Sequence, residues 1–245
     1  MAKYKVTWKG AVLISILLLP SSIYLVLTTG RHNFVHLPIV GPREAIEVVD
    51  ENGKTSVDTV YHQIPDFTLI NQDGDTVTRE DMLGKIYVAD FFFTRCPTIC
   101  PAMQFSMLRL QNRFVDYNDF ALVSHSVDPL FDTPEVLNTY AEELGADLSN
   151  WTFLTGEKDS IYKLAYEGYF VNAMEDDGAP GGFLHSEYLV LVDKEGRIRS
   201  GLDDDGNIRG VYDGTSDHDV GELIDDIKVL MAEYRLALKK NEPKD

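Results

Sequence analysis

Cysteine is scarce in this chain, which holds only two among its 245 residues, Cys96 and Cys100. That number excludes a framework of several disulfides, of the kind that stabilises small secreted domains. One disulfide between these two residues would close a very short loop and would restrict the unfolded chain little. The pair therefore calls for a chemical explanation, although a purely structural disulfide stays open as an alternative.

Basic residues are also few, because 22 Lys and Arg stand against 40 Asp and Glu, a net charge of −18. Nucleic acid is excluded as a partner, since binding phosphates requires a basic face. Acidic side chains gather at residues 175–177 and 203–205, which we interpret as solvated turns. The sequence has no internal repeat, and its 44% apolar content suffices for one globular domain.

Charge is absent from residues 10–30, an apolar run about as long as a helix needs to cross a bilayer. Lys3, Lys5 and Lys9 precede it, so we expect residues 1–9 to stay in the cytoplasm. The run is longer than the apolar part of a usual signal peptide, and no Ala-x-Ala cleavage site follows it. We predict a single-pass anchor in the cell (inner) membrane of a bacterium, with the domain facing the periplasm or the outside. A cleaved signal peptide is the alternative.

After the anchor, residues 31–64 are predicted to form an extended polar lead, residues 65–240 the globular domain and residues 241–245 a tail. Turn residues and apolar periodicity predict alternating strands and helices within the domain. The expected elements are a hairpin at 65–78, strand 85–93, a helix from Cys100 to Phe114, strand 120–127, helix 134–145, strand 151–154, helix 158–166, a loop over 171–182, a hairpin at 186–198 and a final helix from residue 216 or 217. This order predicts the α/β class, with a mixed sheet covered on both faces by helices.

The two cysteines stand where a buried strand meets a helix: Cys96 follows the strand, and Cys100 falls in the first helical turn. Unpaired amides and the helix dipole stabilise thiolates there, so we expect both thiols to be acidic and reactive. A spacing of four residues places side chains on one face of a helix, where both sulfurs can bind one ion. Two thiolates suit Cu(I), and one imidazole would complete a three-coordinate copper site. A structural zinc site would need a fourth protein ligand, and none is evident.

The imidazole has to come from one of six histidines. His125 lies within an apolar strand, where a core position with a local hydrogen-bond partner is expected. His185 follows a glycine-rich loop, residues 178–182, at the start of a strand, and such a loop can face the strand end that carries the cysteines. The residues alone leave His185 open as a ligand or as a surface histidine. The other four lie before the domain or open its last helix: His32, His36, His62 and His218.

Three segments of the chain resemble the Sco/SenC family. They are residues 92–101 (FFTRCPTICP), the paired motifs at residues 126–129 (SVDP) and 132–134 (DTP), and His185 with Ser186. The resemblance runs from about residue 65 to the final helix. It implies a thioredoxin-like fold, tethered outside the cytoplasmic membrane or in the mitochondrial intermembrane space.

The same resemblance implies a site and a role. Cys96, Cys100 and His185 would bind one copper ion, Cu(I) or Cu(II). The ion would be delivered to the binuclear copper centre of cytochrome c oxidase during assembly. The implied partners are the copper-bearing subunit of the oxidase, other copper carriers and thiol–disulfide reductants.

Several residues near the motifs have other expected roles. Leu184 stands where family members often carry Asp before the histidine, and residues 199–207 look like an insertion to which the sequence assigns no role. Asp128 and Asp132 are expected to hold the strand-to-helix turn rather than to bind metal. Met174 is a soft side chain that we expect to pack in its loop.

Two alternative activities involve the same cysteines. A thiol–disulfide oxidoreductase would use Cys96 and Cys100 as a redox-active pair to reduce the copper-ligand cysteines of the oxidase. Reductases of the thioredoxin type use CxxC, whereas this chain has a three-residue spacer. A peroxidase would need Thr or Ser three residues before its cysteine, where this chain has Phe93. We therefore expect a metallochaperone rather than an enzyme, with the reductase as the alternative.

Overall fold

The computed structural model describes residues 36–49, 55–176 and 180–241, together with Trp8, Ile16, Leu18, Leu19, Gly53 and Gly178. The chain divides into two compact units, Met1–Val35 and His36–Asp245, and every strand described below belongs to the second. Apart from four single positions, the predicted cytoplasmic segment 1–9 and the predicted anchor 10–30 lie outside the described residues. Among the described residues, no helix is both long and apolar enough to span a bilayer.

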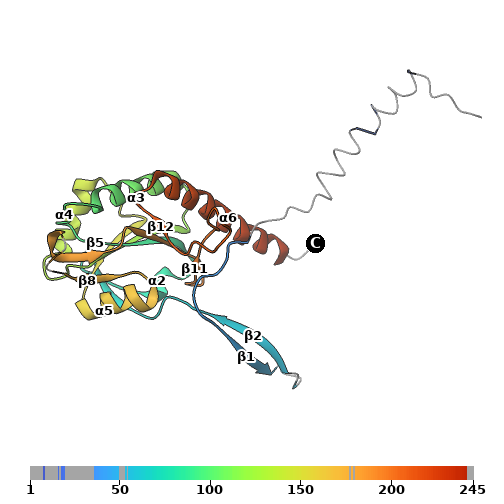
Figure 1. Cartoon of the computed structure of the whole chain (residues 1–245), viewed down its shortest axis with the longest axis horizontal. Helices are drawn as coiled ribbons and strands as arrows, with labels where there is room; N and C mark the ends of the chain where they lie inside the picture. Colours follow the sequence, from blue (N-terminus) through green and yellow to red (C-terminus); the bar gives the residue numbers. More distant parts are fainter. Residues whose placement is uncertain are drawn as a thin grey trace, which may run out of the picture. The chain divides into compact units, whose positions relative to one another are not determined.

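One mixed sheet forms the centre of the second unit (Figure 1). Its strands are β3 (Thr68–Asn71), β4 (Thr76–Thr78), β5 (Ile86–Phe92), β6 (Phe120–Ser126), β7 (Trp151–Thr155), β10 (Tyr188–Val192), β11 (Ile198–Arg199) and β12 (Tyr212–Asp213). Their order is β11–β10–β5–β6–β7–β3–β4, with β12 paired to β10. β5, β6 and β7 are parallel, and β10 and β3 flank them antiparallel. Every residue of β5 and β6 is buried, which explains their apolar sequences, because a strand covered on both faces has no solvent side.

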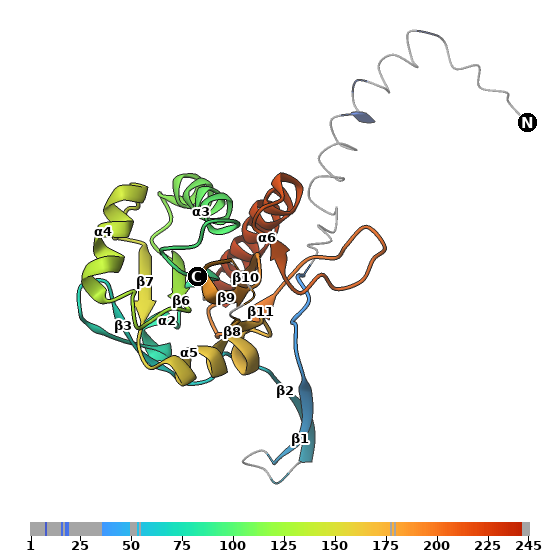
Figure 2. The same ribbon diagram turned by 60° about the vertical axis from the view of Figure 1, so that its left-hand side comes forward.

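Helices cover both faces of this sheet, and the predicted α/β class is confirmed. Figures 1 and 2 show α3 (Cys100–Phe114) and α6 (Asp217–Asn241) on one side and α5 (Lys158–Lys163) on the other. α4 (Pro134–Leu144) begins after Thr133, whose hydroxyl accepts the N–H of Val136, and it ends at Gly145 with φ at +76°. Thr133 is thus a side-chain N-cap and Gly145 a left-handed closing residue, and the bounds agree with the helix predicted over 134–145. The short α2 (Arg79–Met82) connects β4 to β5.

The region before and including His185 differs from the prediction. The helix predicted over residues 158–166 is α5 followed by a π-helical turn, Leu164–Gly168. The loop predicted over 171–182 contains a strand, β8 (Ala173–Glu175), and a 3-10 turn, Pro180–Gly182. β8 pairs antiparallel with β9 (Phe183–His185) in a two-stranded sheet of its own, which we call the β8–β9 ribbon. Strands of three residues are stabilised by their cross-strand partner rather than by local sequence, so the loop prediction was wrong here.

A second hairpin lies within the predicted lead. β1 (Arg43–Val49) and β2 (Thr55–Tyr61) pair antiparallel in register from Arg43–Tyr61 to Val49–Thr55. Nearly all of their residues are exposed, and Figure 1 shows the hairpin projecting from the domain. The sequence does not predict it, because neither strand has a buried face to give a regular apolar alternation.

The chain just before this hairpin is tied to the domain by a buried arginine. Arg199 donates to the carbonyl oxygen of Leu37 from Nε (3.1 Å) and Nη2 (2.8 Å), and it pairs with Glu233 of α6 at 2.7 Å. Glu233 also accepts the N–H of Leu37 at 2.7 Å, and Asp193 pairs with Arg199 at 3.0 Å. We call this group of four residues the N-terminal clamp. It joins the chain near residue 37 to β11 and to α6.

Candidate metal centre

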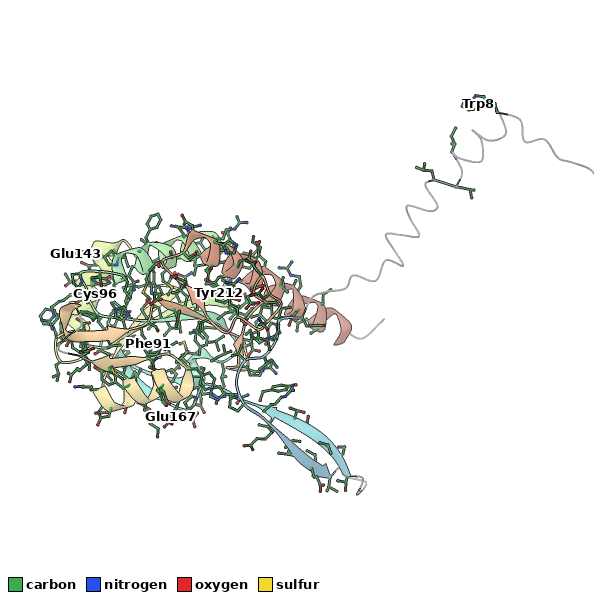
Figure 3. All side chains as sticks on the ribbon, in the orientation of Figure 1. Trp8, Phe91, Cys96, Glu143, Glu167 and Tyr212 are labelled. Carbon is green, nitrogen blue, oxygen red and sulfur yellow. The ribbon has the colours of Figure 1, made fainter. Side chains whose placement is uncertain are left out.

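Both cysteines lie at the end of β5, but they do not share a helix. The chain leaves β5 at Phe92 and turns, and the N–H of Cys96 bonds to the carbonyl oxygen of Phe93 at 3.1 Å. α3 begins at Cys100, so Cys96 lies in the turn before the helix. The expectation that helical spacing aligns the two sulfurs is therefore wrong. The turn itself brings Cys96 back beside the first residue of α3, and Figure 3 shows Cys96 well away from the β1–β2 hairpin.

His185 reaches the cysteines from the β8–β9 ribbon. Its Nε2 lies 3.2 Å from the Sγ of Cys100 and 3.6 Å from the Sγ of Cys96. One ligand atom from each of the three residues lies within 4.8 Å of the others. All three side chains are largely buried, with 9% of Cys96, 7% of His185 and 2% of Cys100 exposed. The three residues thus form a potential metal site of two sulfurs and one nitrogen.

The orientation of the imidazole is fixed by its second nitrogen and by an aromatic ring. His185 Nδ1 lies 3.2 Å from the carbonyl oxygen of Ser186. A carbonyl oxygen only accepts, so Nδ1 carries the proton and Nε2 presents its lone pair to the site. The ring of Phe93 packs edge-on against the imidazole, with centroids 5.5 Å apart. Gly181, at φ +83°, packs so closely on Phe93 that an added Cβ would lie 2.7 Å from the ring.

The two thiols have opposite pKa shifts. The hydrogen bond from Cys100 lowers the pKa of Cys96, although burial acts in the opposite direction. The same bond to Cys96, together with burial, raises the pKa of Cys100. The expectation that both thiols are acidic is correct for Cys96 and wrong for Cys100, because one shared hydrogen bond lets one sulfur carry the charge at the expense of the other.

The loop between β6 and α4 supports the turn that carries Cys96. Asp132 accepts hydrogen bonds from the N–H and the hydroxyl of Thr94 and from the hydroxyl of Ser126. Asp128, which is also buried, pairs with Arg95. Asp132 thus holds its own strand-to-helix loop through Ser126, as expected, and both aspartates also support the turn of Cys96, which the sequence does not predict. Met174 pairs with Leu184 across the ribbon, whereas His185 pairs with Ala173, so strand alternation places Met174 on the face opposite His185.

The other described histidines lie elsewhere. His125 is fully buried, stacks on Phe91 and bonds through Nδ1 to the carbonyl oxygen of Asp90, which confirms the predicted core position. His62 contacts the carbonyl oxygen of Gly168 at 2.8 Å. His36 and His218 are exposed beside carboxylates of α6, and His32 lies outside the described residues.

Asp90 is a residue near the site that the sequence analysis does not single out. It is fully buried in β5, and its Oδ2 accepts a hydrogen bond from Nε2 of Gln104 on α3 at 2.8 Å. Burial raises the pKa of Asp90 to about 6. The signal in the sequence is a single carboxylate within an otherwise apolar run, residues 86–93. Burying a carboxylate in such a strand is unfavourable unless it is paired or protonated.

A mixed sheet flanked by helices, with two thiols after a central strand and an imidazole beside them, defines a thioredoxin-like protein with a potential soft-metal site. The family model for SCO1/SenC matches residues 56–217, and the chain belongs to this family. The SCO1 protein homolog of Bacillus subtilis is 32% identical over 178 residues, which cover 72% of this chain and 86% of that protein.

Two solved structures show the same likeness. BsSco, described as a Sco-family cytochrome c oxidase assembly protein with a disulfide switch, is 30% identical with a TM-score of 0.58. The match covers 69% of this chain and 93% of that one. Arabidopsis thaliana ScoI with copper bound is 27% identical with a TM-score of 0.54, covering 69% of this chain and 98% of that one.

Proposed function

We propose that this chain is a copper chaperone. It binds one copper ion through Cys96, Cys100 and His185 and delivers it to the binuclear copper centre of cytochrome c oxidase during assembly. The observation that carries the proposal is the convergence of two sulfurs and one imidazole nitrogen within 4.8 Å. The likeness to a copper-bound ScoI and to an oxidase assembly protein supports it.

The donor set favours copper over zinc. Thiolates are soft ligands that suit Cu(I), and two thiolates with one imidazole also suit Cu(II). A structural zinc site takes four protein ligands, and this cluster offers three. Three ligands leave one side of the ion open, and Cys96 is the ligand with the largest exposed fraction. Thiolates of the acceptor can therefore replace the chain's own ligands one at a time, beginning beside Cys96.

Copper binding is tested on the full chain, purified in detergent, reduced and then loaded with Cu(I) or Cu(II). We expect one copper per chain and, with Cu(II), a thiolate charge-transfer band in the visible spectrum. Cys96→Ser and Cys100→Ser lose the band, and His185→Ala lowers affinity at least tenfold. His218→Ala is the matched control, because this histidine is exposed on α6, and it keeps wild-type copper content. A wild-type chain without stoichiometric copper would sink the proposal.

The second candidate is a thiol–disulfide oxidoreductase, favoured by the acidified thiol of Cys96 beside Cys100. The Cys96 thiolate would attack a disulfide of the partner and form a mixed disulfide. Cys100 would then release the partner as a dithiol and leave a disulfide between Cys96 and Cys100. His185→Ala separates the two functions, because it removes a copper ligand and keeps both thiols. Reduction of the partner that survives in His185→Ala, together with no copper binding in the wild type, favours the reductase.

We further propose the chain layout expected from the sequence: residues 1–9 in the cytoplasm, 10–30 as a single-pass anchor in the cell (inner) membrane, 31–64 as a lead, 65–240 as the domain and 241–245 as a tail. The uncharged run preceded by three lysines supports it. In alkaline extraction the chain should stay with the membrane, and protease added outside spheroplasts should digest the domain. Release by alkali, or full protection from the protease, contradicts this layout.

A further inference from the structure

Two exposed apolar side chains stand beside the turn that carries Cys96. Leu130 and Phe131 lie in the loop between β6 and α4, with 84% and 43% of their surfaces exposed. The guanidinium of Arg95, the residue next to Cys96, lies 3.9 Å from the centre of the Phe131 ring. The loop is therefore in contact with the turn that presents Cys96.

This loop is held in one conformation although its tip is exposed. The N–H groups of Phe131 and Asp132 bond to the carbonyl oxygen of Asp128, at 3.0 and 2.9 Å. The side chain of Asp128 is buried against Arg95, and that of Asp132 against Thr94. A loop held in this way cannot fold Leu130 back onto the core, so its side chain stays in water. Leu130 and Phe131 are adjacent and both exposed, and contiguous exposed apolar surface, unlike a single side chain, marks protein–protein contact sites.

The position of the loop indicates what covers it. The three ligand side chains of the site are nine-tenths buried or more, so an acceptor has to contact the surface next to Cys96 before its thiolates reach the ion. Beside the loop, Arg95 is paired with Asp128, whereas Glu135 and Glu143 line the hollow next to Thr94 and leave this face acidic. An acceptor whose apolar contact is surrounded by basic side chains would therefore be attracted to this face.

We infer that Leu130 and Phe131 form the docking surface for the copper acceptor, a protein with an apolar hollow beside its own thiolate ligands. The inference rests on the proposed copper delivery and adds the surface through which delivery takes place. Leu130 enters the hollow, and Phe131, fixed by Arg95, sets the approach of the acceptor toward Cys96. The copper ligands themselves take no part in this recognition.

The test compares transfer of copper to two acceptors. Copper-loaded full chain is mixed either with the soluble copper-bearing domain of the oxidase subunit from the same organism or with a small Cu(I) chelator. We expect Leu130→Asp and Phe131→Ala to slow transfer to the protein at least tenfold and to leave transfer to the chelator unchanged. Leu202→Asp is the matched control, since Leu202 is half exposed near the turn at residues 203–207, and it should match the wild type in both assays.

Three outcomes overturn the inference. Equal transfer to the protein by wild type and Leu130→Asp shows that the loop is not used. Slower transfer to both acceptors shows damage to the site instead of lost docking. If the variants change only the self-association of the chain, measured by sedimentation, and leave copper transfer unchanged, the surface binds a second copy of the chain. A wild-type chain that binds no copper is recognised before any transfer is measured, and it removes the proposed function together with this inference.

Discussion

Asp90 shows how one buried carboxylate links the core to the site. Its Oδ2 accepts from Gln104, while its Oδ1 and the Oε1 of Gln104 have no hydrogen-bond partner among the described residues. Burying such acceptors without donors is unfavourable, and a proton on Asp90 supplies the missing donor. Burial raises the pKa of Asp90 to about 6, in agreement with a carboxyl group that is readily protonated.

This carboxyl makes stability depend on pH. The folded pKa of Asp90, about 6, exceeds the unfolded value of 3.8, so the folded state binds more protons between these values. The contribution of Asp90 to the free energy of unfolding therefore falls as pH rises from about 4 to about 6, and it stays low above that. Asp90→Asn removes this dependence. The free energy of unfolding of the variant minus that of the wild type should therefore rise by about 3 kcal/mol from pH 3.5 to pH 7. Urea denaturation at a series of pH values measures it, and parallel pH profiles would contradict it.

At the scale of elements, the turn before β9 determines where the imidazole lies. Gly181 and Gly182 both have left-handed backbone angles, with φ at +83° and +86°. Only at Gly181 would a Cβ meet Phe93, the ring that packs edge-on against His185; at Gly182 it would meet no atom within 4 Å. Both glycines therefore need the left-handed backbone conformation, but only Gly181 lies against Phe93 and so against the site.

Alanine at the two positions separates these effects. Gly181→Ala and Gly182→Ala should each lower the free energy of unfolding by about 1 kcal/mol through the left-handed backbone. Gly181→Ala also displaces Phe93 and with it His185, so we expect it alone to lower copper affinity about tenfold or more. Chelator competition measures the affinity, and thermal melting measures the stability. Equal affinities in the two variants would show that Phe93 does not position the imidazole.

The elements that the sequence predicts well are those whose pattern is set by burial along many residues. β5 and β6 are continuous apolar runs, and α6 buries a regular apolar stripe. The β8–β9 ribbon and the β1–β2 hairpin are missed, since cross-strand pairing rather than a buried face stabilises them.

The same distinction applies to the site. The cysteine pair is evident from its local spacing, but His185 stands out only through the family resemblance, because 85 residues separate it from Cys100. The contact of Phe131 with Arg95 has no signal in the sequence, since it joins residues 36 positions apart through the packing of two loops. Long-range contacts of this kind depend on the fold and cannot be predicted from spacing.

At the scale of the whole molecule, the N-terminal clamp holds together parts of the chain that are far apart in sequence. Arg199, Asp193 and Glu233 are all largely buried; Arg199 pairs with both carboxylates, and Asp193 also pairs with Arg197 at 2.8 Å. Removing Arg199 would leave the largely buried carboxylate of Glu233 without its guanidinium partner and would break the bonds to the carbonyl oxygen of Leu37, while Asp193 would keep its pair with Arg197. Loss of one partner in a buried ion network is far more damaging than loss of an exposed pair.

We therefore expect Arg199→Ala to lower the free energy of unfolding by about 3–5 kcal/mol. The comparison is Lys228→Ala, which removes an exposed ion pair with Asp225 within α6 and should change stability by less than about 0.5 kcal/mol. Urea denaturation of both variants gives the two values. Similar small losses would show that the segment near Leu37 is held by apolar packing alone.

The melting temperature should depend on copper loading, because the ligands come from two separate parts of the fold, the β8–β9 ribbon and the segment from the Cys96 turn to α3. An ion bound by Cys100 and His185 closes a loop of 85 residues between α3 and the separate β8–β9 ribbon. Free copper at a hundred times its dissociation constant stabilises the folded chain by about 2.7 kcal/mol, which raises the melting temperature by roughly 5–10 °C. Calorimetry with and without copper measures the rise, and identical melting temperatures would contradict it.

The separate β8–β9 ribbon also gives the loaded and unloaded proteins different lifetimes. Without the ion, the described part of the ribbon meets the cysteine turn through the contacts of His185 with the two sulfurs and through packing on Phe93. Local opening there is then less costly, and proteases cut chains while they are open. Proteolysis should therefore remove the unloaded chain first, so that the surviving pool is enriched in chains that hold the ion.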